Sequence, residues 1–215
     1  MTILKEGEVN LEGFVSGYYK FSVWLVRFAY LNFLWVLFTI LGLGVFGLMP
    51  ATTAMFTVVR KWLMGENDIA VFKTFWASYR SDFLKTNILG IILFLMGYVL
   101  IMEFRILQLQ ESVIYFIVSF GVLAIFMLYA VLLIYFFPIF VHFNLKMTDY
   151  FKWPFIIGIV HPILTLFLIV GTSIVFYITF ITIPAILFFF GGSATAFFIM
   201  WGVSKTFTKL EMKEA

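Results

Sequence analysis

The stretch Trp153–Ser204, WPFIIGIVHPILTLFLIVGTSIVFYITFITIPAILFFFGGSATAFFIMWGVS, decides the fold class because its 52 residues include no Asp, Glu, Lys or Arg. A membrane-spanning helix needs about 20 predominantly apolar residues to cross roughly 30 Å of hydrocarbon. One helix of this length would rise about 78 Å, so the stretch predicts two crossings. The expected break is Thr182–Pro184, because proline fixes its own φ and disfavours helix in the residue before it.

Three further stretches without charged side chains precede this one, at Phe28–Val59, Thr86–Met102 and Ser112–Val141. Hydrophobic residues make up 64% of the 215-residue chain, charged residues make up 12%, and the mean hydropathy is +1.10. A soluble chain is about half apolar and about a quarter charged. Long apolar runs in lipid are helical, because a helix satisfies its own backbone groups. The composition predicts an all-α integral membrane bundle, one domain over residues 1–215, with the lipid bilayer as its partner.

The number of crossings in Phe28–Val59 depends on whether Gly42–Pro50 forms a turn between two helices. Lys and Arg of short loops concentrate on the cytoplasmic side of a membrane. One crossing here divides the 14 basic residues into ten and four, whereas two crossings divide them into 13 and one. The second division predicts six segments in the cell membrane, with both termini in the cytoplasm. Their approximate ranges are 21–43, 46–63, 86–103, 112–141, 155–180 and 184–204, and the short range 46–63 also fits a re-entrant arm.

The longest polar insertion, residues 64–85, contains an amphipathic helix at about 68–85. Aromatic side chains recur along it at helical spacing, and charged side chains occupy the rest of its circumference. One interpretation is an interfacial helix that lies along the inner leaflet. The other is a docking face for a cytoplasmic partner, which would bind the helix in a groove. The candidate residues of this docking face are Phe72, Phe75, Trp76, Arg80 and Phe83.

A few polar or helix-breaking residues within the predicted spans define a candidate intramembrane polar cluster. An amide in hydrocarbon needs partners, so Asn32 predicts either a hydrogen bond to a neighbouring helix or a ligand site. His161 is the only ionisable side chain in Trp153–Ser204, which makes it a candidate for substrate or proton binding. The proline after it also predicts a structural kink. The cluster comprises Asn32, Pro50, Thr52, His161 and Pro162.

The sequence shows no motif that would identify an enzyme. It contains no cysteine, which excludes disulfides, zinc–thiolate sites, iron–sulfur clusters and thiol nucleophiles. Gly42-x-Gly44-x-x-Gly47 matches a dinucleotide-binding pattern, but it lacks the βαβ context and predicts a turn between membrane helices. We therefore expect no catalytic residues, no cofactor, no metal and no nucleic-acid partner. Small residues at Gly191–Ala196 suit tight helix packing or a contact within a homo-oligomer.

Several short motifs resemble the YesL family, small membrane proteins of Gram-positive bacteria whose molecular function is unassigned. They are Asn32-Phe33-Leu34-Trp35, Gly47-Leu48-Met49-Pro50-Ala51-Thr52-Thr53-Ala54, Arg60-Lys61-Trp62, the spaced set Phe72, Phe75, Trp76, Tyr79, Arg80 and Phe83, His161-Pro162-Ile163-Leu164-Thr165, and Ile183-Pro184-Ala185. The resemblance covers most of the chain, and Met49 departs from the glycine more usual in the family. It implies a genomic association with carbohydrate uptake and degradation, and it implies no catalytic residues.

Two functional hypotheses follow from these observations. The first is a non-enzymatic accessory or regulatory protein of carbohydrate uptake, which acts by contact with a transporter subunit or a membrane sensor through the docking face. The alternative is a small transporter or substrate-binding membrane subunit for a carbohydrate or another small solute, with its cavity near the polar cluster. An intramembrane enzyme would need a catalytic pair, and the spans contain no paired acids and only one buried histidine.

Overall fold

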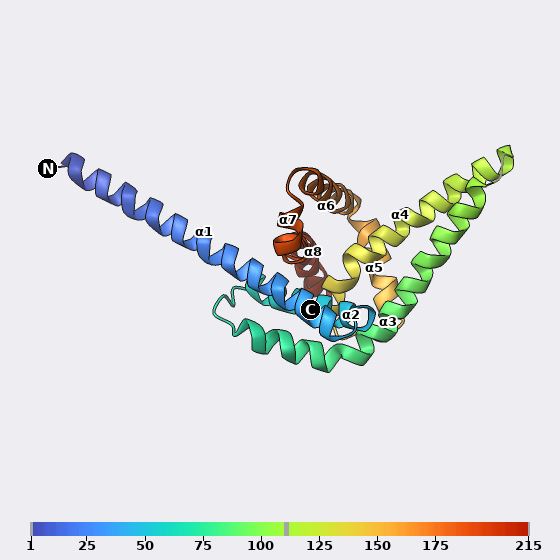
Figure 1. Cartoon of the computed structure of the whole chain (residues 1–215), viewed down its shortest axis with the longest axis horizontal. Coiled ribbons are helices and arrows are strands. Elements are labelled where there is room, and N and C mark those ends of the chain that lie inside the picture. The colour runs from blue at the N-terminus through green and yellow to red at the C-terminus, as the bar shows by residue number, and fades with distance from the viewer. Residues whose placement is uncertain (1, 110–111, 215) are drawn as a thin grey trace.

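The computed structural model describes residues 2–109 and 112–214, and the side chains of residues 17–109 and 112–207. Within this part of the chain every regular element is a helix, which confirms the predicted all-α fold (Figure 1). The helices are α1 (Thr2–Leu41), α2 (Val45–Leu63), α3 (Val71–Gln108), α4 (Val113–His142), α5 (Asp149–Val160), α6 (Pro162–Thr182), α7 (Pro184–Ile186), the π-helix η1 (Leu187–Gly191) and α8 (Gly192–Glu214).

Five of the described helical stretches are long and apolar enough to cross a membrane. They are Gly17–Leu41, Val71–Gln108, Val113–His142, Pro162–Thr182 and Pro184–Phe207. At most 33% of the most apolar window of any of these stretches is buried inside the protein. Apolar surface on this scale requires lipid around it, since a soluble chain would bury far more of it. The chain is therefore a multi-pass membrane protein.

Helix α2 coincides with the predicted short segment 46–63 and is not one of these five stretches. Ten of its 19 residues are buried. It packs against α1, α3, α4 and α8, and Figure 1 shows it near the centre of the molecule. The helix is thus buried by protein along much of its length, which explains how a segment with Arg60 and Lys61 in its last turn belongs to the bundle.

The predicted turn between the first two helices is present at Gly42–Gly44. Leu43 and Gly44 have positive φ values of 60° and 73°, a conformation that costs glycine little. A β-carbon on Gly47 would collide with the carbonyl oxygens of Phe38 and Thr39. The glycine pattern therefore serves a tight turn and the close approach of two helices, as the sequence predicted.

The predicted amphipathic helix 68–85 and the predicted segment 86–103 form one continuous helix, α3. Figure 1 shows α3 changing direction between its first half, which lies beside α1 and α2, and its second half, which pairs with α4. The aromatic side of the first half packs around Phe38 of α1, whose ring centroid lies 5.1 Å from that of Tyr79 and 5.3 Å from that of Phe75. The aromatic stripe thus faces another helix of the same chain.

The C-terminal half contains the predicted break and one additional break. Helix α6 ends at Thr182 and α7 begins at Pro184, which matches the predicted boundary. The predicted single range 155–180 is divided at His161, where ψ is 60° and the chain leaves the helical conformation between α5 and α6. The cause is Pro162, which lacks an amide hydrogen and disfavours helix in the preceding residue.

The helices diverge from a shared centre. Figure 1 shows α1 extending to one side and the α3–α4 hairpin extending to the other, with α2, α5 and α8 between them. The second half of α4 reaches this centre, where Leu132, Tyr135, Phe136 and Ile139 are fully or almost fully buried. The N-terminal half of α4 is mostly exposed, as expected of a helix that contacts lipid.

Candidate functional site

Asn32 of α1 joins the first helix to the π-helix and α8. Its Nδ2 atom donates a hydrogen bond to the carbonyl oxygen of Phe188 at 2.6 Å, and its Oδ1 atom accepts one from the backbone N–H of Ser193 at 3.1 Å. The side chain is 1% exposed. Both ends of the amide are therefore satisfied by backbone groups, which favours the packing interpretation of Asn32 over the ligand site.

Thr52 and Pro50 belong to a different contact, between α1 and α2. The indole Nε1 of Trp35 donates to Thr52 Oγ1 at 3.0 Å, and Thr52 Oγ1 donates to the Leu48 carbonyl at 2.7 Å. Pro50 is buried near the start of α2. These residues hold the first two helices together and line no described pocket.

His161 and Pro162 lie at the junction of α5 and α6, and the structure does not bring them to the other members of the cluster. The His161 carbonyl accepts hydrogen bonds from the Thr165 hydroxyl at 2.9 Å and the Thr165 amide at 3.0 Å. None of the described contacts joins His161 to Asn32 or Thr52, and the shallow depression beside His161 is lined by Val160–Leu164 and Phe167. The described contacts therefore do not join the residues of the predicted polar cluster, because depth in a span does not fix which helix face a residue occupies.

The predicted docking face is only partly accessible. Phe75 has no exposed surface, and Phe83 is partly buried against Tyr79. Phe72 and Trp76 remain 48% and 43% exposed, and Arg80 is also exposed. Phe75 is therefore a core residue, while Phe72, Trp76 and Arg80 are the part of the face that a partner can reach.

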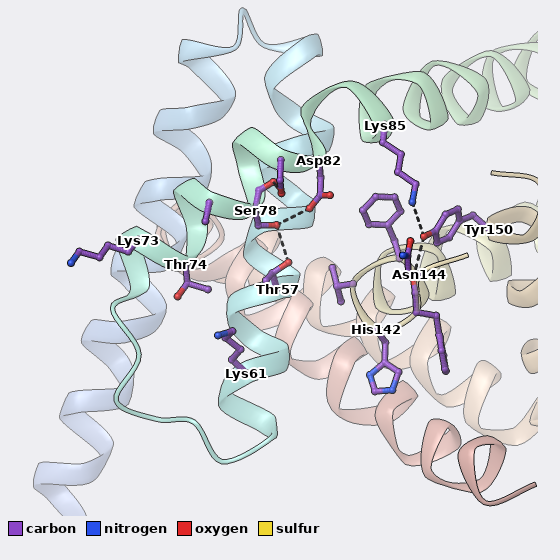
Figure 2. Close-up of a pocket in the computed structure, with 15 residues that line it drawn as sticks. Thr57, Lys61, Lys73, Thr74, Ser78, Asp82, Lys85, His142, Asn144 and Tyr150 are labelled. Carbon is purple, nitrogen blue, oxygen red and sulfur yellow. Dashed lines mark hydrogen bonds between the residues drawn. The ribbon is translucent and has the colours of Figure 1, made fainter. Parts of the chain in front are cut away.

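A polar pocket that the sequence did not predict lies between α2, the first half of α3 and the link from α4 to α5 (Figure 2). Its volume is about 720 Å³. It is open on one side and is lined by three separate parts of the chain. The lining residues are Thr57, Lys61, Lys73, Thr74, Ala77, Ser78, Ser81, Asp82, Lys85, Phe140, Val141, His142, Phe143, Asn144 and Tyr150.

Hydroxyl groups connect α2 and α3 on one wall of this pocket. Thr57 Oγ1 and Ser78 Oγ are 3.0 Å apart, and Ser78 Oγ donates to Asp82 Oδ2 at 3.2 Å. Figure 2 shows these three side chains pointing toward one another. The Asp82 carboxylate is therefore held on the pocket wall, where its remaining lone pairs can accept hydrogen bonds.

The opposite wall holds the ammonium group of Lys85 against aromatic rings. Lys85 Nζ donates to Tyr150 Oη at 3.0 Å, and it lies 4.7 Å from the Tyr150 ring centroid and 5.2 Å from that of Phe140. Tyr150 is 1% exposed and is fixed by two backbone bonds, since its Oη donates to the Phe143 carbonyl and accepts from the Leu145 amide, both at 3.1 Å. The position of Lys85 is thus set by a rigid neighbour.

Further charged groups surround these walls. Arg60 Nε donates to His142 Nδ1 at 3.2 Å, and the His142 ring stacks on Phe207 with centroids 4.5 Å apart. Lys61 Nζ is 3.4 Å from Glu66 Oε2, and both side chains are substantially exposed. An ion pair so open to solvent is weak and leaves the Lys61 ammonium available to a ligand.

The pocket provides hydrogen bonding and charge. Among the described residues, no group of three or more His, Cys, Asp or Glu side chains is placed to hold a metal ion. The described contacts place no imidazole or amine within hydrogen-bonding distance of Ser78, the pocket serine paired with Asp82. Sequence reasoning missed the site because it followed the aromatic side of 68–85, whereas Ser78, Asp82 and Lys85 recur at helical spacing on an adjoining side. This second helical periodicity was the sequence signal that could have predicted the pocket.

Comparison with known proteins places the chain in a family. It is 34% identical to "Uncharacterized protein YteU" of Bacillus subtilis (strain 168), over 93% of this chain and 89% of that protein. The chain belongs to the DUF624 family. The model of that family, described as "Protein of unknown function, DUF624", matches residues 28–104.

Two further relatives of this DUF624 protein occur in the same organism. "Uncharacterized protein YesL" is 33% identical over 93% of both chains, and "Uncharacterized protein YesV" is 34% identical over 85% of this chain and 89% of its own. These matches confirm the resemblance to the YesL family. No solved structure matches the chain. The family model covers the α2 and α3 walls of the pocket and stops before the wall formed by Phe140–Tyr150.

Proposed function

We propose that this DUF624 protein is a non-enzymatic membrane protein that binds a small hydroxylated solute in the polar pocket and serves carbohydrate uptake as an accessory subunit. The observation that carries the proposal is the pocket itself. Its volume of about 720 Å³ lies within the range of about 300–1,000 Å³ typical of small-molecule sites. Family resemblance supports the carbohydrate context.

The lining groups fit a solute rich in hydroxyls. Asn144 can donate and accept hydrogen bonds, and Asp82 and the hydroxyl oxygens of Thr57 and Ser78 can accept them from a solute hydroxyl. The rings of Phe140 and Tyr150 provide an apolar surface for the less polar face of such a solute. Polar groups that converge on a partly aromatic wall orient a ligand without the need for a reactive centre.

The hydrogen bonds of Ser78 support a binding role. Ser78 shares its hydroxyl with Thr57 and Asp82. A serine nucleophile requires an adjacent general base within hydrogen-bond reach that is itself oriented by a third group. A carboxylate that accepts a hydrogen bond from serine without an intervening imidazole does not reproduce that arrangement. Binding is the function that this geometry performs directly.

Thermal unfolding in the presence of sugars tests the proposal. The protein would be purified in a polyoxyethylene detergent, which contains neither sugar nor phosphate, and melted against a panel of neutral and phosphorylated monosaccharides and disaccharides. A ligand at 100 times its Kd stabilises a protein by about 2.7 kcal/mol, which corresponds to about 5–10 °C for a chain of this size. Unchanged melting temperatures across the panel would contradict the proposal.

Matched variants locate the binding site. Asn144→Ala removes an exposed amide that lines the pocket, so we expect it to weaken the ligand-dependent shift while the unliganded melting temperature stays the same. The control is Ser119→Ala, because Ser119 is exposed and bonds only the Phe116 carbonyl of its own helix. Equal shifts in the two variants would place the binding site elsewhere.

A second candidate function is a contact role through the accessible part of the docking face. The exposed rings of Phe72 and Trp76 lie near Arg80 on α3, a combination that is enriched at protein interfaces. The partner would be a carbohydrate transporter subunit or a membrane sensor. Affinity purification of Phe72→Ser combined with Arg80→Glu should lose such a subunit, while the control Leu84→Ser should retain it. Full recovery by the double variant would refute this role.

A further inference from the structure

We infer that the solute bound in the polar pocket carries a phosphate group, which Lys85 binds while the hydroxyl and amide groups bind its hydroxylated part. This inference rests on the proposed binding function of the pocket. It specifies the chemical class of ligand, a phosphorylated sugar or a phosphate-bearing polyol.

The charges that line the pocket are unbalanced. Three lysines, Lys61, Lys73 and Lys85, and one carboxylate, Asp82, line the pocket, and Glu66 beside it pairs with Lys61. Asp82 already accepts a hydrogen bond from Ser78, and no described ion pair joins it to any of the three lysines. The pocket therefore has an excess of positive charge, which attracts an anionic ligand and disfavours a cationic one.

Lys85 supplies the strongest argument. The residue is partly buried, and its ammonium donates to the hydroxyl of Tyr150, with aromatic rings beside it. Among the described ion pairs Lys85 has no carboxylate partner. A partly desolvated charge without a counter-ion is costly, and an incoming anion relieves that cost. An ammonium has three donors, so two remain for the oxygens of a phosphate after Tyr150 is satisfied.

The start of α3 adds positive potential at the end of the pocket away from Lys85 (Figure 2). Lys73 and Thr74 belong to its first turn and line the pocket. The helix has no side-chain cap at Ala70, so its first backbone N–H groups carry the partial positive charge of the helix dipole unneutralised. Figure 2 shows the Lys73 ammonium pointing away from the Ser78–Asp82 pair and Lys61 on the far side of Thr57 from Lys85, and for this reason Lys85 is the assigned phosphate contact.

Two kinds of molecule combine a phosphate group with further polar groups: a soluble sugar phosphate and the headgroup of a phosphate-bearing glycerolipid. The volume of about 720 Å³ exceeds that of a bare phosphate, so the ligand includes a further polar part in either case. Titration calorimetry in the polyoxyethylene detergent separates these sources with four probes: glucose, glucose 6-phosphate, inorganic phosphate and short-chain phosphatidylglycerol below its micelle concentration.

We expect glucose 6-phosphate or phosphatidylglycerol to bind at least tenfold more tightly than glucose and inorganic phosphate. Losing a hydrogen bond to a charged group weakens binding by about tenfold to hundredfold. We expect a loss of this size for Lys85→Met, which keeps the apolar stem against Phe140. The charge-matched control Lys152→Met lies outside the pocket, on an exposed side chain of α5, and should bind like the natural protein.

The outcomes test the phosphate assignment and the solute-binding proposal separately. Tighter glucose 6-phosphate binding that depends on Lys85 supports a soluble ligand, and the same dependence for phosphatidylglycerol alone supports a lipid headgroup. Equal affinity for glucose and glucose 6-phosphate, with no binding of the lipid, overturns the phosphate assignment and leaves the solute-binding proposal intact. No binding of any probe by the natural protein overturns both.

Discussion

Replacing Asn32 with alanine should destabilise the protein by removing the hydrogen bonds that connect α1 to η1 and α8. Asn32 makes two such bonds, to the carbonyl of Phe188 at 2.6 Å and from the amide of Ser193 at 3.1 Å. Hydrogen bonds between membrane helices contribute about 0.6 kcal/mol on average and up to about 1.7 kcal/mol each. The expected loss is therefore about 1–3 kcal/mol, or about 2–12 °C in melting temperature for a chain of this size.

The natural fluorescence of the six tryptophans reports thermal unfolding in detergent without a label. The matched control is Asn87→Ala, because the Asn87 amide donates only to the Phe83 carbonyl within its own helix, at 2.8 Å. Its expected cost is about 0.6 kcal/mol or less. Gly192→Ala should reproduce the Asn32 effect, since a β-carbon there would lie 2.8 Å from Asn32 Oδ1. Equal melting temperatures for Asn32→Ala and Asn87→Ala would refute the interhelical role of Asn32.

Three further predictions test the packing and the topology. Phe75→Ala should cost about 3–5 kcal/mol in thermal unfolding, whereas Phe72→Ala should cost less than about 1 kcal/mol, and equal costs would show that the aromatic stripe is not packed against Phe38. Gly47→Ala should cost about 1–3 kcal/mol by forcing α1 and α2 apart, and an unchanged melting temperature would contradict that contact. In this cysteine-free chain, an impermeant maleimide on intact cells should label Ser112→Cys and not Asn67→Cys. Labelling of Asn67→Cys would exclude the six-segment topology.

Most of the helices could be predicted because charged residues and prolines mark their ends. The predicted segment 112–141 differs from α4 by one residue at each end, and Ser112 caps that helix by accepting from the Ile114 amide at 3.4 Å. The boundary predicted at residue 85 does not exist, because no proline or glycine separates Lys85 from Thr86 and a helix continues where nothing stops it. A change from polar to apolar composition marks the point where a chain enters the hydrocarbon of the membrane. One continuous helix can pass through that point.

The candidate site was harder to predict, for a physical reason. Asn32 was recognised as a residue in need of a partner, but its partners are the backbone groups of Phe188 and Ser193, which carry no side-chain signal. The pocket combines residues near 57, 78 and 145 that approach only after the bundle has packed. Helical periodicity defines the faces of a helix, and tertiary structure decides which face meets which neighbour.

The two faces of the first half of α3 explain how a membrane protein accommodates so many charges in one helix. Charged side chains within apolar helices are costly in lipid and are found where they face protein or water. In α3 the aromatic side chains pack around Phe38 of the α1–α2 hairpin, and Phe75 is fully buried there. Asp82 and Lys85, on an adjoining side, line the open pocket. The aromatic packing thus directs the charged face toward the pocket, so a loss of packing at Phe75 should also weaken ligand binding at Lys85.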